Sequence, residues 1–137
     1  MALVTTTDGV KIFYETHGSG SPVLFVHEFG GDYRSWSQQV SDLKSGYQCI
    51  TYSARGFWPS DTPDDATLYG QRQASNDLLT LLDHLELDAA HLVGTSMGSF
   101  TSLDVALRHP ERVLSLTLVG NSSGPRDDEE REHFRCS

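Results

Sequence analysis

The 137-residue chain is poor in cysteine and contains no long hydrophobic run. Its two cysteines are Cys49, inside an apolar segment, and Cys136, next to the chain end, and two such residues do not make a disulfide framework. No apolar run approaches the roughly 20 residues that span a bilayer. Residues 1–10 lack the basic and apolar regions of a signal peptide. We therefore expect no membrane contact and a cytoplasmic location.

Basic residues are also scarce. The chain has 10 Lys and Arg against 19 Asp and Glu, which gives a formal net charge of -9. This balance excludes the basic footprint that nucleic-acid binding requires. Hydrophobic residues make up 37% and charged residues 21%, and these proportions are typical of one globular domain rather than a disordered chain.

The order of the expected elements indicates an α/β fold. Two β-prone segments flank Asp8 and Gly9, a hairpin turn signal. Apolar runs typical of strands then alternate with helix-like segments. The strand-like runs are residues 23–27, 47–52, 90–94 and 113–120, and the helix-like segments are residues 32–46, 73–87 and 97–109. This alternation predicts a mainly parallel sheet with an N-terminal antiparallel hairpin and helices on both faces.

Two of the helix-like segments carry an apolar stripe at helical spacing. In the first, Asp32 is a candidate N-cap and Gly46 a stop signal. The apolar positions are Trp36, Val40 and Leu43 in that segment, and Ala74, Leu78, Leu82 and Leu85 in the second. We expect these faces to pack on the sheet.

Ser96 lies in a G-x-S-x-G pattern between a strand-like and a helix-like segment. The pattern alone is weak, but a strand-turn-helix setting is what a nucleophile elbow requires. In so tight a turn, side chains at Gly94 and Gly98 would collide, and the serine backbone is expected to be strained. The helix begins at once, so the Met97 N–H can donate to an oxyanion.

The loop after the first buried strand can supply a second oxyanion donor. Gly30 and Gly31 allow its backbone to approach the site closely. His27 and Glu28 are further candidates for lining the site, and we expect His27 to order the loop backbone.

The loop after the next strand, residues 53–61, contains Arg55, Phe57 and Trp58. Arg55 is expected to pair with Asp61 and hold the loop. Phe57 and Trp58 either line a pocket or pack, and we favour a structural role for this loop as a whole.

These three segments, in this order, resemble the α/β-hydrolase superfamily over about residues 8–124. Residues 26–31 (VHEFGG) are similar to the family's H-G-x-G oxyanion loop, and residues 52–61 (YSARGFWPSD) to its D-x-R-G-x-G-x-S loop. Residues 94–99 (GTSMGS) are similar to its nucleophile elbow, in the form found in esterases, enol-lactone hydrolases and cofactor-free haloperoxidases.

The resemblance implies a serine hydrolase that acts on a small carboxylic ester or lactone through an acyl-enzyme, without a cofactor. It makes Ser96 the nucleophile, with the N–H groups of Met97 and Phe29 as oxyanion donors. It also makes residues 1–124 the N-terminal part of the hydrolase core and the acidic residues 125–137 the start of a cap region.

Two departures from the family pattern matter. Glu28 stands where the family usually has glycine. A carboxylate aimed into an oxyanion hole opposes the developing negative charge, so Glu28 either points away or holds the resting site closed. The family's acid and histidine follow the serine on later loops, and no residues after Ser96 match them. We therefore expect this chain alone to be weak or inactive.

The remaining histidines are poor substitutes for the missing base. They are His17, His84, His91, His109 and His133, and the first four lie in elements where a structural or solvent-facing role is expected. No pair has zinc-ligand spacing with a third partner, so we expect no metal. Residues 18–22 (GSGSP) precede a strand and fail as a dinucleotide fingerprint.

Two interpretations of function stay open. One is the hydrolase, and the other is a non-catalytic binding or interaction module that keeps the elbow as a feature of the fold. In both cases the last strand, residues 113–120, would be an apolar edge, and we expect a homodimer or another association through it.

Overall fold

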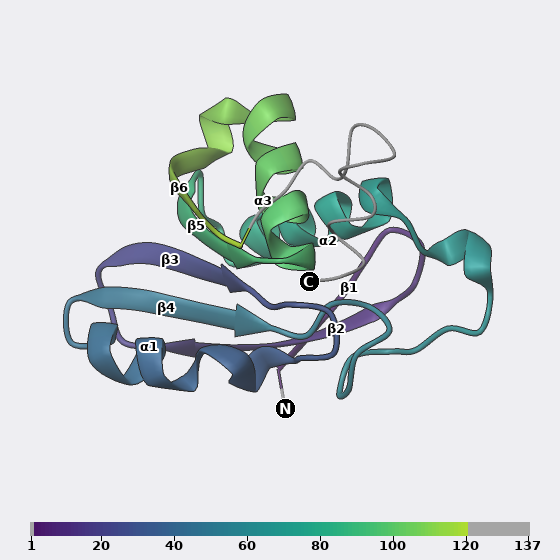
Figure 1. The fold of residues 1–137 in the computed structure, drawn as a ribbon, viewed down its shortest axis with the longest axis horizontal. Coiled ribbons are helices and arrows are strands. Elements are labelled where there is room, and N and C mark those ends of the chain that lie inside the picture. Colours follow the sequence, from purple (N-terminus) through teal and green to yellow (C-terminus); the bar gives the residue numbers. More distant parts are fainter. Residues whose placement is uncertain (1, 121–137) are drawn as a thin grey trace, which may run out of the picture.

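Six strands form one sheet in the order β1-β2-β4-β3-β5-β6 (Figure 1). The structure is a computed structural model that describes residues 2–120. The strands are β1 (Leu3–Thr5), β2 (Lys11–His17), β3 (Ser21–Val26), β4 (Tyr47–Tyr52), β5 (Ala90–Thr95) and β6 (Val113–Val119). The α-helices are α1 (Ser37–Leu43), α2 (Gln71–His84) and α3 (Met97–Arg108), and the short 3-10 helices are η1 (Tyr33–Trp36), η2 (Ala66–Leu68) and η3 (Pro110–Arg112).

The strand pairing confirms the predicted mainly parallel sheet. β1 and β2 form an antiparallel hairpin, whose turn is closed by the Thr6 N–H donating to the Val10 carbonyl at 2.9 Å. β2 also pairs antiparallel with β4, whereas β4, β3, β5 and β6 run parallel to one another. Because the parallel strands share one direction, the loops after β3, β4 and β5 meet at one end of the sheet.

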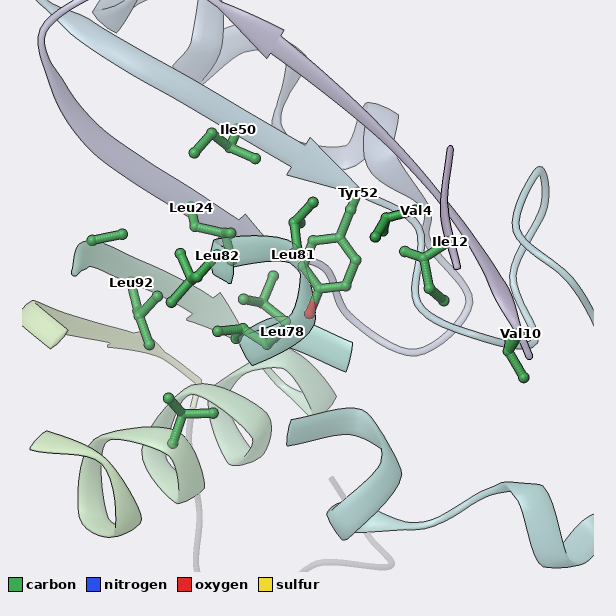
Figure 2. Close-up of a cluster of buried hydrophobic side chains, with 13 residues drawn as sticks. Val4, Val10, Ile12, Leu24, Ile50, Tyr52, Leu78, Leu81, Leu82 and Leu92 are labelled. Carbon is green, nitrogen blue, oxygen red and sulfur yellow. The ribbon is translucent and has the colours of Figure 1, made fainter. Parts of the chain in front are cut away.

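Helices cover both faces of the sheet, α1 on one and α2 with α3 on the other (Figure 1). The larger core lies between the sheet and α2, where Leu78, Leu81 and Leu82 pack against side chains of β3, β4 and β5 (Figure 2). The smaller core joins Trp36 and Val40 to the other face. These contacts confirm the predicted stripes at Trp36 and Val40 and at Leu78, Leu82 and Leu85. Leu43 is 36% exposed, and Ala74 is only partly buried and outside both cores.

The last described strand, β6, is far more open than the central strands. Leu114 and Val119 are 53% and 49% exposed, while β3 and β4 each end in four buried residues. None of the described helices is long and apolar enough to cross a membrane. The expected boundary at residue 124 and the acidic segment 125–137 lie outside the described residues.

Candidate active site

Ser96 occupies the single residue between β5 and α3. Its backbone has φ 53° and ψ -118°, a conformation that non-glycine residues rarely adopt, and the residue is exposed. The Ser96 N–H donates to the Val119 carbonyl at 3.2 Å, which ties the turn to β6. The strain predicted from the sequence is therefore present, and it raises the hydroxyl above the end of the sheet.

The two glycines around Ser96 are required by close backbone contacts. A Cβ on Gly94 would overlap the Gly98 carbonyl oxygen, and a Cβ on Gly98 would overlap the carbonyl oxygen of Val26. The same added Cβ on Gly98 would lie 2.8 Å from the His27 carbonyl oxygen. Helix α3 therefore begins directly against the loop that leaves β3.

The start of α3 offers a free donor beside the serine. The Ser99 N–H donates to the Ser96 carbonyl at 2.9 Å, and the Phe100 N–H contacts the same oxygen. The Met97 N–H lies one step earlier, where a helix has no acceptor of its own. The sequence predicts an oxyanion donor at this residue.

The loop after β3 is a tight turn that carries Phe29 at its tip. The Gly31 N–H donates to the Glu28 carbonyl at 3.1 Å, and Gly30 has φ +87°, as the third residue of a type II turn requires. The Phe29 side chain is 78% exposed and meets the Phe57 ring edge-on, with centroids 5.7 Å apart.

His27 joins this loop to the one that follows β4. Its side chain is buried, and its Nε2 atom accepts a hydrogen bond from the Ala54 N–H at 2.9 Å. Since a backbone N–H can only donate, Nε2 carries no proton, and Nδ1 must carry the proton that it shares with the Glu28 carbonyl at 2.7 Å. Burial lowers the pKa of His27, although the Glu28 carbonyl partly opposes this.

Glu28 points away from the serine. Its Oε1 atom accepts a hydrogen bond from the Ser35 hydroxyl at 2.8 Å and lies beside Gly31. The carboxylate is therefore held toward η1 rather than toward the start of α3.

Trp58 packs outside the region of Ser96. The Arg34 guanidinium lies 5.1 Å from its ring centroid, and the ring is close to Tyr33. The indole is 61% exposed. Of the two aromatic residues in this loop, Phe57 faces the site and Trp58 does not.

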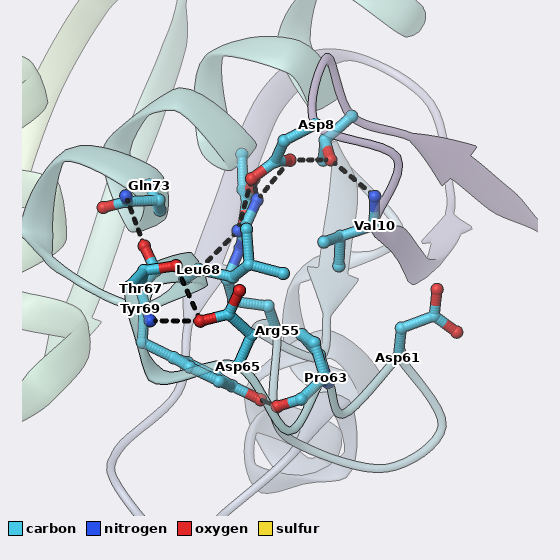
Figure 3. Close-up of polar contacts among 12 residues, drawn as sticks. Asp8, Val10, Arg55, Asp61, Pro63, Asp65, Thr67, Leu68, Tyr69 and Gln73 are labelled. Atoms are coloured by element: carbon cyan, nitrogen blue, oxygen red, sulfur yellow. Dashed lines mark hydrogen bonds and ion pairs between the residues drawn. The ribbon is translucent and has the colours of Figure 1, made fainter.

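The expected pairing of Arg55 with Asp61 is wrong. Arg55 is buried and binds both oxygens of Asp77 at 2.7 Å. It also binds Asp8 at 2.8 and 2.9 Å and the Leu68 carbonyl at 2.6 Å (Figure 3). The Asp61 carboxylate instead accepts from the Lys11 N–H at 2.9 Å. A buried guanidinium needs a charged partner at close range, and the buried Asp77 on α2 provides it.

These contacts use all five N–H donors of Arg55. The Asp77 contact raises the pKa of Arg55, and the guanidinium holds the pKa of Asp8 well below its usual range. Burial raises the pKa of Asp77 despite the guanidinium beside it. Arg55 thus ties the hairpin turn, η2 and α2 together and has no donor left for a ligand.

A pocket of about 490 Å³ opens next to the elbow. Its lining is largely small and apolar, with aromatic residues from two loops. The lining residues are Val26, Phe29, Tyr52, Ala54, Arg55, Gly56, Phe57, Tyr69, Gly70, Gln71, Ala74, Asp77, Met97 and Thr101. Both predicted oxyanion donors, Phe29 and Met97, are among them, whereas His27, Glu28, Gly30 and Trp58 are not.

The other described histidines are hydrogen-bonded or paired away from Ser96. His17 contacts Glu15, His84 contacts the Tyr14 hydroxyl, and His109 lies near Glu111. His91 binds the hydroxyls of Ser21 and Ser115 at the opposite end of the parallel strands. His133 lies outside the described residues. Within residues 2–120, no histidine is hydrogen-bonded to the Ser96 hydroxyl, and no cluster of three metal-binding side chains occurs.

The sequence reading missed Asp77 and Tyr69. Asp77 could have been found, because it falls between Ala74 and Leu81 on the apolar face of its helix. An acidic residue at such a position demands a buried basic partner. Nothing in the sequence indicated that Tyr69 lines the pocket, because an aromatic residue in a loop is commonly exposed to solvent.

Comparisons with known proteins agree with this geometry. A sequence model described as the alpha/beta hydrolase fold matches residues 21–134. The chain is 30% identical over 123 residues to 3-oxoadipate enol-lactonase 1 of Acinetobacter baylyi, covering 88% of this chain and 45% of that protein.

Solved structures of other proteins share this fold. An epoxide hydrolase of Vigna radiata superposes with a TM-score of 0.86 at 28% identity, covering 93% of this chain and 40% of that one. An esterase of Exiguobacterium antarcticum gives a TM-score of 0.85 at 28% identity, covering 94% and 49%. The chain therefore spans less than half the length of these relatives. Through the family match, the fold and the elbow together, the chain belongs to the α/β-hydrolase fold family.

Proposed function

We propose that this chain carries the nucleophile and oxyanion hole of a serine hydrolase that acts on a carboxylic ester or lactone. The observation that carries the proposal is the conformation of Ser96. The residue is exposed and strained, and it stands between the end of a parallel strand and the start of a helix. The adjoining pocket, with its apolar lining, suits the acyl or alkyl part of a small substrate.

In the proposed reaction, the Ser96 oxygen attacks the ester carbonyl carbon while its proton passes to a general base. The carbonyl oxygen becomes an oxyanion that accepts hydrogen bonds from the Met97 and Phe29 N–H groups. Collapse expels the alcohol, which takes up the proton and leaves an acyl group on Ser96. Water then attacks this acyl-enzyme by the same route and releases the acid.

The residue type at position 96 favours esters and lactones over epoxides. A serine oxygen that opened an epoxide would leave an ether on the protein, and water does not cleave an ether under mild conditions. The same oxygen attacking an ester leaves a new ester, which water can cleave. The likeness to epoxide hydrolases therefore supports the shared fold rather than a shared substrate.

We propose further that the chain by itself turns over slowly. Among residues 2–120, no base is hydrogen-bonded to the Ser96 hydroxyl, and an unassisted serine is a poor nucleophile at neutral pH. Loss of the histidine in a serine protease slows the reaction on the order of a millionfold.

The test is reaction with a fluorophosphonate followed by peptide mapping. We expect slow labelling of Ser96 and none in Ser96→Ala, with unchanged labelling in Ser41→Ala, a control at an exposed serine of α1. Labelling at the rate of intact serine hydrolases would contradict the slow turnover. Equal labelling of Ser96→Ala would contradict the role of Ser96.

The alternative is a non-catalytic binding module. The observation in its favour is that no base contacts the Ser96 hydroxyl among the described residues 2–120. In that case, a small apolar ligand would bind in the pocket, and its affinity would be the same in Ser96→Ala. Titration of ester substrates and their product acids by NMR distinguishes the two. A hydrolase converts the ester over time, and a binding module leaves it intact.

Association through β6 and a cytoplasmic location remain part of the proposal. The exposed Leu114 and Val119 on the last described strand support association, because a bare apolar strand edge favours pairing with another chain. Sedimentation velocity over a range of protein concentrations tests it, and a monomer throughout would contradict it.

A further inference from the structure

The buried imidazole of His27 links the two loops that form the site. Its Nε2 atom accepts a hydrogen bond from the Ala54 N–H at 2.9 Å, and its Nδ1–H donates one to the Glu28 carbonyl at 2.7 Å. That carbonyl also accepts the Gly31 N–H, which closes the turn that carries Phe29. The His27 ring therefore contacts the same carbonyl oxygen that closes the turn around Phe29.

This arrangement works only with a neutral ring. A proton on Nε2 would face the Ala54 N–H, so two donors would meet with no acceptor between them. The Ala54 N–H would lose its partner, and the ring would have to turn or leave its site. A rotation of the ring breaks the Nδ1 contact as well, and with it one of the two hydrogen bonds on the Glu28 carbonyl.

The charged groups around His27 come from its own loop. Glu28 and Asp32 favour the protonated ring, but Glu28 is bonded to Ser35, and Asp32 is paired with Arg34. The loop after β4 contributes Ala54 and Phe57, and α3 contributes Gly98. None of these three residues titrates. Burial dominates and lowers the pKa of His27 below the usual 6.5.

We propose that His27 is a positioning residue that holds the Phe29 N–H in the oxyanion hole while its ring is neutral, and that protonation of the ring releases this loop and reversibly stops the reaction. The role of the Phe29 N–H rests on the proposed function. The hydrogen-bonded clamp between the two loops does not, so the two parts can be tested separately.

The first experiment follows the clamp by NMR, with the whole chain labelled with ¹⁵N. At neutral pH, we expect the imidazole to be protonated on Nδ1 and unprotonated on Nε2. On acidification, the amides of Ala54, Phe29 and Gly31 should shift together, with one midpoint below pH 6.5 that matches the His27 ring. An Nε2-protonated ring at neutral pH, or no joint shift of Ala54 and Phe29, would overturn the clamp.

The second experiment measures the rate of Ser96 labelling by a neutral fluorophosphonate between pH 5 and 8. Loss of one oxyanion donor slows such reactions by about a hundredfold or more. We expect a fall of this order in acid for the native chain, beyond any fall in His27→Gln. The glutamine amide oxygen can accept from Ala54 but does not titrate. The control is His84→Gln, at an exposed histidine bonded to Tyr14, which should behave as the native chain.

The outcomes separate the two parts. A joint amide shift without any change in the labelling profile would overturn the positioning role and keep only a structural clamp. Absence of Ser96 labelling at every pH would overturn the proposed function, and the NMR titration would still decide the clamp. If His27→Gln does not fold, the NMR titration of the native chain decides the clamp. Agreement between its midpoint and that of the native labelling profile then decides the positioning role.

Discussion

The loops after β3 and β4 reach the same end of the sheet but are fixed by opposite kinds of interaction. The first is held by a neutral imidazole and a tight turn, through His27 and Gly30. The second is held by the buried guanidinium of Arg55, between two carboxylates. In the proposed reaction, the first loop presents the Phe29 N–H to a developing negative charge, so an extra charge beside it would disturb that reaction. The loop after β4 lines the pocket through Arg55, whose charge is neutralised by its carboxylate partners.

The largest expected effect on stability is at the ion pair that holds the loop after β4. Asp77→Ala should lower the free energy of unfolding by about 3–5 kcal/mol, because it leaves the buried Arg55 charge with only the partly exposed Asp8. Urea denaturation measures this change.

The matched control lies on the same helix. Asp83 pairs with Arg112 but is 68% exposed, so Asp83→Ala should cost at most about 1 kcal/mol. Similar losses at Asp77 and Asp83 would show that burial of the ion pair adds nothing to stability.

A smaller effect on stability is expected where the loop after β3 contacts the start of α3. Gly98→Ala places a methyl group against the Val26 carbonyl, and overpacking of this kind costs about 1–3 kcal/mol. It should also slow Ser96 labelling, because α3 and the loop after β3 must move apart. Gly46→Ala meets no atom within 4 Å and is the control. A Gly98→Ala protein with native stability and labelling would contradict the close contact.

The two loops should also differ in their dependence on pH. The folded chain keeps His27 neutral with a pKa below 6.5, while the unfolded chain takes up a proton near 6.5. The stability that His27 contributes is therefore complete above pH 6.5 and is lost as the pH falls below it. The slope is at most about 1.4 kcal/mol per pH unit.

The comparison that isolates this effect is native chain against His27→Gln, by chemical denaturation between pH 7.5 and 5.5. The native chain should lose stability more steeply. Asp8, whose pKa Arg55 depresses, loses its contribution only in stronger acid. Parallel curves for the two proteins would contradict a neutral, buried His27.

The smallest effect on folding is expected at the open edge of the sheet. Leu114→Lys should abolish self-association through β6 while changing stability little, because Leu114 is already 53% exposed. Leu107→Lys, on the outer side of α3 at 74% exposure, should leave association unchanged. Equal sedimentation behaviour of both variants and the native chain would argue against the β6 edge.

Much of the fold could be predicted from local signals. The Asp8-Gly9 turn, the apolar runs of β3 and β4 and the glycines around Ser96 each fix the backbone over a few residues. Asp32 caps η1 as expected, since its carboxylate accepts from the Arg34 N–H. Such features depend on neighbours in the sequence and are therefore visible in it.

The site was only partly visible, because its remaining contacts join distant segments. Arg55 binds Asp8 and Asp77, and neither partner is near it in the sequence. The direction of Glu28 depends on the Ser35 hydroxyl, and either direction was compatible with the sequence. Side-chain partners of this kind are set by packing, and a pattern of residue types does not determine them.

The central claim is that backbone geometry, rather than a neighbouring histidine, makes Ser96 the reactive serine of this chain. Ser115 provides the contrast, because its hydroxyl lies 2.7 Å from His91 but on an ordinary strand with no helix start beside it. The most direct measurement is site-resolved mass spectrometry of the native chain after limited reaction with a fluorophosphonate. The account predicts label on Ser96 and none on Ser115. Label on Ser115 in preference to Ser96 would contradict it.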